Sequence, residues 1–226
     1  CASPPEGIST VRMRQLAQPH VLKSAALAAL ITSLVCFPRL ASRQAPYPIW
    51  YLESVTFVGS FMLWAFVFAW HTRFTHRPVF HHRIELQLWA IATAAGIVVA
   101  LVLHRFLDPV LRLRTPADYP ASVDEWLVTT AFALAFNPLF LTFAPLAWAI
   151  RLLDRLRLAV GFTVLFGVFV LLVKVQSAPL PPMVFIELLT LRLVMGSFSV
   201  YFYLRGGAAL TWWWALLLQL RHLLTL

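Results

Sequence analysis

The chain has 226 residues, of which 61% are hydrophobic and 12% are charged, and its formal net charge is +9. So few polar residues cannot cover a water-soluble domain of this size, which excludes a soluble globular protein. The basic side chains stand between apolar runs, as in the 73–83 and 151–157 connections, and this distribution is typical of loops beside membrane-spanning helices. We therefore predict the lipid bilayer as a partner and no nucleic acid.

Seven apolar stretches are long enough to cross a bilayer, because most of them approach or exceed the ~20 residues that a ~30 Å hydrocarbon core requires. They cover residues 22–38, 48–71, 85–107, 126–150, 158–177, 181–204 and 207–226. The short alternating segments that mark a membrane β-barrel are absent from the sequence. We predict an all-α, polytopic transmembrane helical bundle of about seven spans. Residues 1–20 would form a short polar arm, and residues 21–226 a single transmembrane domain.

Lys and Arg residues are more numerous on the side of the N-terminal segment than on the opposite side of the predicted spans. The positive-inside bias then places the N-terminus in the cytoplasm. We predict an integral membrane protein of the bacterial cytoplasmic membrane.

The fourth predicted span contains Asn137-Pro138, and Pro145 follows within the same apolar run. Each proline removes a backbone hydrogen bond, so we expect a kink or break near the middle of the membrane. Such breaks line cavities in transporters and intramembrane enzymes, and a kink that neighbouring helices pack is the simpler alternative.

The segment 191–224 consists of a span, a glycine turn and a second span. Five of its residues match a pattern found in a known family of membrane proteins: Gly196, Tyr203, Arg205, Gly207 and Leu210. In these positions the segment resembles the end of the CPBP family, the polytopic membrane proteins that include CAAX-processing proteases and bacteriocin-processing enzymes. The resemblance runs from about residue 120 onward, and it implies a CPBP-like fold.

The family's chemistry depends on a Glu-Glu-x-x-x-Arg motif, a Phe-x-x-x-His motif and a final histidine, and the chain departs from all three. The positions of the first motif are occupied by Asn137, Pro138 and Thr142 or, in a second register, by Asp124, Glu125 and Thr129. Those of the second motif are occupied by Phe169 and Val173. The position of the final histidine is occupied by Gln219, and His222 follows one turn later. Without the acid pair and the histidines, the groups that activate water are missing. The resemblance therefore implies a non-catalytic relative.

Glu187 and Arg192 lie inside the sixth predicted span, where an unpaired charge costs at least ~2.5–3.5 kcal/mol. Their spacing puts them roughly 140° apart around a helix, so we expect them to face different neighbours. We interpret them as structural polar residues at membrane depth, together with Asn137, Thr142 and Gln219. A proton or ion path and an altered active site are the alternatives.

Histidines gather near one predicted membrane face, and His104 stands near the other. Histidine is the commonest metal ligand and can hold a haem or a pigment, and His71 and His104 are the first candidates for that role. A zinc site would need Cys or carboxylate ligands at short spacing, and only Glu85 is close to the histidines in the sequence. We predict no cofactor and no metal, with a bound lipid, pigment or haem as the alternative.

We predict a pseudoenzyme, a non-catalytic CPBP-like accessory or structural subunit of a larger membrane complex, respiratory or photosynthetic. Nine Trp and 18 Phe residues would provide rigid faces for packing against other integral membrane subunits. One alternative is an intramembrane CAAX-type protease with substituted active-site residues. Its candidate residues are Asp124, Glu125, Glu187 and Arg192. A second alternative is a small-molecule or ion carrier.

Overall fold

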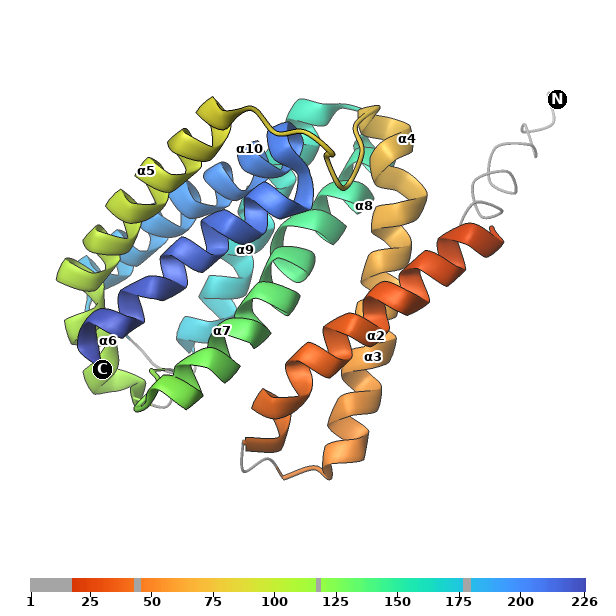
Figure 1. Ribbon diagram of the computed structural model, residues 1–226. Coiled ribbons are helices and arrows are strands. Elements are labelled where there is room, and N and C mark those ends of the chain that lie inside the picture. Colours follow the sequence, from red (N-terminus) through yellow and green to blue (C-terminus); the bar gives the residue numbers. More distant parts are fainter. Residues whose placement is uncertain (1–17, 43–45, 117–118, 177–179) are drawn as a thin grey trace, which may run out of the picture.

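The computed structural model describes residues 18–42, 46–116, 119–176 and 180–226, and within these residues it contains helices and no β-strand (Figure 1). The elements in chain order are α2 (Pro19–Ser42), α3 (Ile49–Phe66), η1 (Val67–His71), α4 (Thr72–Thr75), α5 (Leu86–Val102), η2 (Leu103–Leu107), α6 (Asp108–Arg114), α7 (Val123–Pro138), η4 (Leu139–Phe143), α8 (Ala144–Leu153), α9 (Leu156–Gln176), α10 (Pro182–Leu220) and η5 (Arg221–Thr225). The predicted all-α helical bundle is confirmed. Residues 1–17 of the predicted polar arm lie outside the described residues.

Six helices of the described chain are long and apolar enough to cross a membrane, which identifies an integral membrane protein. They are Pro19–Ser42, Ile49–Thr75, Leu86–Arg114, Val123–Leu153, Leu156–Gln176 and Pro182–Leu224. The count is six and not the predicted seven, because the expected spans 181–204 and 207–226 are two helical arms joined directly at Gly207 and are counted together as α10. The chain of α10 reverses direction within that element, and its C-terminal arm ends at the same end of the bundle as α6 (Figure 1).

The reversal of α10 occurs at Gly207, whose φ of 68° and ψ of −161° belong to a region that only glycine adopts readily. The connection between α4 and α5 docks against this turn. The Ala208 N–H donates to the Val79 carbonyl at 2.9 Å, and the Arg77 guanidinium donates to the Leu204 carbonyl. The turn and the connection therefore hold each other in place.

The predicted irregularity in the fourth span is confirmed, and it takes the form of a π-helical turn. α7 ends at Pro138, η4 follows with the wider π geometry, and α8 continues the same span. The change of winding lies between Pro138 and Pro145, and the helix continues past both prolines without ending. Ser122 caps the start of this span, since its hydroxyl accepts a hydrogen bond from the Glu125 N–H at 3.2 Å.

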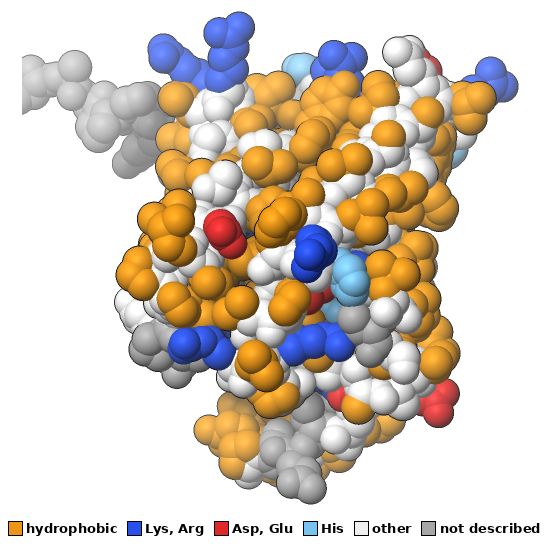
Figure 2. Space-filling view, turned by 90° about the vertical axis from the view of Figure 1, so that its left-hand side faces the viewer, with side chains coloured by type: hydrophobic (Ala, Val, Ile, Leu, Met, Phe, Trp, Pro, Cys, Tyr) orange, Lys and Arg blue, Asp and Glu red, His pale blue; other side chains and the backbone are white. Residues whose placement is uncertain are grey.

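Two clusters of buried apolar side chains form the interior. One surrounds Phe143 and Tyr203, whose rings stack with centroids 4.3 Å apart, and the other surrounds Phe202 and Trp214. The Trp214 indole N–H donates to the Ser199 hydroxyl at 3.2 Å, which joins the two arms of α10. On the face shown in Figure 2, hydrophobic side chains dominate, and Lys and Arg side chains gather at its upper end and again in its lower half. This surface fits a protein surrounded by lipid.

Candidate functional site

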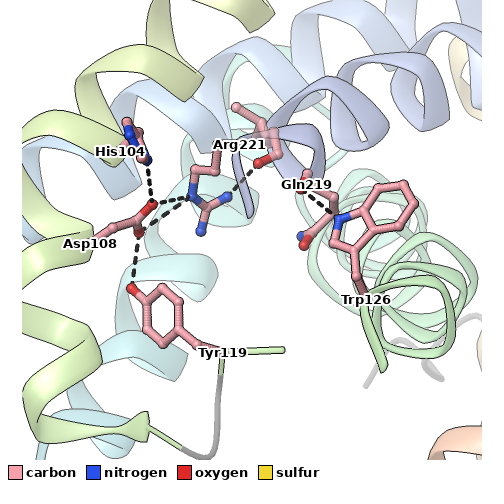
Figure 3. A network of polar contacts seen from close by, with 7 residues as sticks. His104, Asp108, Tyr119, Trp126, Gln219 and Arg221 are labelled. Carbon is pink, nitrogen blue, oxygen red and sulfur yellow. Dashed lines mark hydrogen bonds and ion pairs between the residues drawn. The ribbon is translucent and has the colours of Figure 1, made fainter. Parts of the chain in front are cut away.

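A cluster of polar side chains lies at the end of the bundle where α6 begins (Figure 3). The Asp108 side chain is only 4% exposed, and its Oδ2 lies 3.2 Å from Nε of Arg221. The Tyr119 hydroxyl donates to Oδ1 of Asp108 at 2.9 Å. His104, one turn earlier, places its Nδ1 3.9 Å from Oδ2, which is too long for a hydrogen bond. The carboxylate thus joins the start of α6 and the connection that follows it to Arg221, which is 113 residues away in the sequence.

Further contacts attach the C-terminal end of α10 to its neighbours. The Arg221 guanidinium also donates to the Leu218 carbonyl, and the Trp126 indole N–H of α7 donates to the Gln219 carbonyl at 3.0 Å (Figure 3). The Tyr119 ring meets the edge of the His222 ring, with the two centroids 5.2 Å apart. These contacts fix α6, α7 and η5 relative to one another.

Burial raises the pKa of the Tyr119 hydroxyl well above its ordinary value, and the negative charge of Asp108 adds to the effect. The neighbouring cations Arg221 and Arg112 oppose this shift without cancelling it. The phenol therefore stays protonated at neutral pH and acts as a hydrogen-bond donor to Asp108.

Replacing Tyr119 by phenylalanine should lower the free energy of unfolding by about 1.5–3 kcal/mol, the range for a hydrogen bond to a charged group. The difference should stay constant at neutral pH and shrink above the ordinary tyrosine pKa of about 10, because there the unfolded chain loses a proton that the folded protein retains. Reversible unfolding in detergent, followed by tryptophan fluorescence from about pH 7 to about pH 11, measures both effects. A difference that does not shrink at alkaline pH would contradict the assigned bond.

Two adjoining cavities lie next to this cluster, with volumes of about 450 and 260 Å³. The residues that line both of them are Leu111, Ala133, Asn137, Leu188, Gln219 and Arg221. The larger cavity is lined by Arg39 and Lys174, which lie in the last turns of α2 and α9, so it reaches the end of the bundle. The smaller cavity extends to Thr142 and Arg192. Together they match the size of ordinary ligand sites.

Arg192 lies about 15 Å beyond Pro182 along α10 at 1.5 Å per residue, so if this span begins at Pro182 the residue lies near the middle of a ~30 Å hydrocarbon core. Its Nε donates to the Gly167 carbonyl of α9 at 3.0 Å. Gly167 permits this approach, since a Cβ there would lie 3.1 Å from Nη2. Among the described residues no carboxylate forms an ion pair with Arg192. An uncompensated charge at this depth costs at least ~2.5–3.5 kcal/mol.

Four of the five polar residues predicted at membrane depth lie around the smaller cavity. They are Asn137, Thr142, Arg192 and Gln219. Glu187 is separate from them, because its residue is exposed on α10 and lines neither cavity. The hydrogen-bond partner of Arg192 is a backbone carbonyl, that of Gly167, and not one of these polar side chains.

The acidic residues considered for the protease alternative do not face the cavities. Asp124 is exposed at the start of α7. Glu125 forms an ion pair with Arg39, with Oε1 3.2 Å from Nη1, and its Oε2 accepts a hydrogen bond from the Ala121 N–H at 2.9 Å. Neither residue lines the space in which a substrate would lie.

The two histidines considered for a haem or pigment lie at opposite ends of the bundle, in η1 and η2, so they cannot bind one group together. His71 is fully buried, its ring 4.6 Å from that of Tyr203, and neither of its nitrogens has a hydrogen-bond partner among the described residues. His71 lines neither of the two cavities. Within the described part of the chain, no group of three or more His, Cys, Asp or Glu side chains is arranged to hold a metal ion.

Sequence reasoning missed Asp108, Tyr119 and Arg221 as members of one cluster. Asp108 follows His104 by four residues, and this spacing does indicate that the two side chains lie on the same face of a helix. The pairing of Asp108 with Arg221 joins positions 113 residues apart, and no local pattern indicates such a contact.

No family model matches the chain, and neither a curated protein nor a solved structure is significantly similar to it. Function is therefore inferred from the cavities and the polar cluster.

Proposed function

We propose that this protein is a non-catalytic, CPBP-like integral membrane protein that serves as an accessory or structural subunit of a larger membrane complex. One observation carries the proposal: Asp108 is the single carboxylate among the described residues that line the two cavities, and Arg221 and Tyr119 already engage it. Both oxygens of this carboxylate are already occupied, Oδ2 by the Arg221 guanidinium and Oδ1 by the Tyr119 hydroxyl, so neither is free to take a proton from a water molecule. Among the described lining residues, the one carboxylate is therefore not available to activate water in the space where a substrate would lie.

The outer surface supports the second half of the proposal. Large aromatic side chains are exposed on it, among them Trp50, Phe106 and Phe169. Rigid aromatic faces pack well against the helices of neighbouring subunits as well as against lipid. A subunit that catalyses no reaction would stabilise the complex through such packing contacts.

Extraction from native membranes tests this function. The tagged protein, solubilised in a mild detergent at low and at raised salt, should co-purify with one or a few integral membrane proteins in fixed stoichiometry. An unrelated polytopic membrane protein with the same tag is the control. Recovery of the chain as a lone species under the mildest conditions, from membranes that contain it at its natural level, would contradict the proposal.

One observation favours the protease alternative: His104 lies close to Asp108, as an imidazole and a carboxylate would in a hydrolytic site. A protease should cleave a prenylated or leader-bearing peptide, and His104→Ala and Asp108→Asn should each abolish the cleavage. We expect no cleavage by the purified wild-type protein. Turnover that is lost in both variants but retained in Glu187→Gln would establish hydrolysis and refute a non-catalytic role.

A further inference from the structure

The wall of the two cavities is strongly basic. Arg39, Lys174, Arg192 and Arg221 line it, and Asp108 is the one acidic residue among the described lining residues. Glu125 compensates Arg39 at the rim, and Asp108 is held by Arg221. Arg192 donates only to the Gly167 carbonyl, so its charge has no counter-ion among the described residues. A concave, low-dielectric site with an excess of one charge concentrates ligands of the opposite charge.

The remainder of the wall is mixed, because uncharged polar side chains such as Thr129 and Asn137 stand beside apolar ones. The apolar part of the larger cavity includes Phe132 of α7, Leu171 of α9 and Leu188 of α10. The cavities thus combine a buried guanidinium with a partly apolar surface that continues toward the end of the bundle.

We propose that the two cavities form one binding site for an anionic amphiphile, a single-chain lipid with a carboxylate or phosphate head group. The guanidinium of Arg192 would bind the head group, since guanidinium groups match the geometry of both anions. The hydrocarbon chain would lie along Phe132, Leu171 and Leu188.

One feature favours an amphiphile over a small water-soluble anion. The apolar part of the wall, which includes Phe132, Leu171 and Leu188, would stay unfilled around such an ion, whereas a hydrocarbon chain gains free energy by covering it. Binding of the amphiphile also provides the counter-charge that Arg192 lacks. This inference goes beyond the proposed function, because such a site could exist in a subunit or in a solitary protein.

Native mass spectrometry of the full chain in nanodiscs of phosphatidylcholine tests the site. The probes are lysophosphatidic acid and oleate, with lysophosphatidylcholine as the matched lipid without net charge and with inorganic phosphate and acetate as the free anions. We expect stoichiometric binding of lysophosphatidic acid and of oleate, and no binding of the other three probes. Binding of inorganic phosphate with equal affinity would overturn the requirement for a chain, and equal binding of lysophosphatidylcholine would overturn the requirement for an anion.

Arg192→Gln removes the guanidinium and should weaken binding of lysophosphatidic acid at least about tenfold, equivalent to ~1.4 kcal/mol. Arg205→Gln is the matched control, because Arg205 lies on the same helix, is exposed and lines neither cavity. Equal binding by the wild-type and Arg192→Gln proteins would overturn the proposal.

A second pair of variants serves if Arg192→Gln does not fold. A side chain at Gly167 would meet the Arg192 guanidinium, whereas a Cβ at Gly161 of the same helix has nothing within 4 Å. Gly167→Leu should therefore displace the guanidinium and weaken binding at least about tenfold. Gly161→Leu should bind as the wild type does, and equal affinities in both variants would contradict the site.

Discussion

Replacing Gly207 by alanine should lower the free energy of unfolding by about 3 kcal/mol or more. Two costs add at this position. An L-residue is strained at a φ of 68° and a ψ of −161°, and the new Cβ would lie 2.5 Å from the Val79 carbonyl oxygen. That oxygen accepts the hydrogen bond from Ala208, so it cannot move away without breaking the contact between the α4–α5 connection and α10. Reversible unfolding in mixed micelles, or steric trapping, measures the loss.

Gly59→Ala is the matched control for this prediction. Gly59 lies within α3, and a Cβ there has no atom within 4 Å. Because alanine has a higher helix propensity than glycine, the control should be neutral or stabilising by up to about 1 kcal/mol. Equal stabilities of the Gly207→Ala and Gly59→Ala variants would show that the turn of α10 is not fixed in the way described.

Replacing Asp108 by alanine should cost about 3 kcal/mol, because it leaves the Arg221 guanidinium without its counter-ion and the Tyr119 hydroxyl without its acceptor. Burial of the carboxylate makes this loss larger than for a surface ion pair, which contributes about 0–1 kcal/mol. The double variant Asp108→Ala with Arg221→Met should regain part of the loss, since it removes the orphaned charge as well. Unfolding measured in the same micelles compares the variants.

Asp124→Ala is the control for this second prediction, because Asp124 is exposed in the first turn of α7. It should cost less than about 1 kcal/mol, the usual contribution of an acidic residue near a helix N-terminus. A cost as large for Asp124→Ala as for Asp108→Ala would mean that the buried pair does not hold the end of the bundle together.

The helical membrane bundle was predictable because composition and the lengths of apolar runs determine it almost alone. The irregularity near Pro138 was predictable for a similar reason, since a proline removes a backbone hydrogen bond wherever it occurs. The span count failed at Gly206-Gly207. The sequence marks a turn there, but it does not indicate that helical residues continue directly into the turn from both sides and that the α4–α5 connection completes it.

The site was only partly predictable. Asn137, Thr142, Arg192 and Gln219 stood out because polar residues are costly at membrane depth, and the structure places them around one cavity. Glu187 satisfied the same criterion, but its side of α10 faces away from the cavity, and the orientation of a nearly uniform apolar helix cannot be read from its sequence. The pairing of Asp108 with Arg221 depends on tertiary packing between residues 113 positions apart in the sequence, which no local pattern predicts.

An experimental density map of the protein in lipid, at a resolution that shows ordered water, tests the central claim most directly. We predict that the Asp108 carboxylate is hydrogen-bonded to Arg221 and Tyr119, and that no water molecule or metal ion is shared between this carboxylate and an imidazole. Density for a metal ion or water held jointly by Asp108 and His104 or His222, and facing the cavity, would contradict a non-catalytic role.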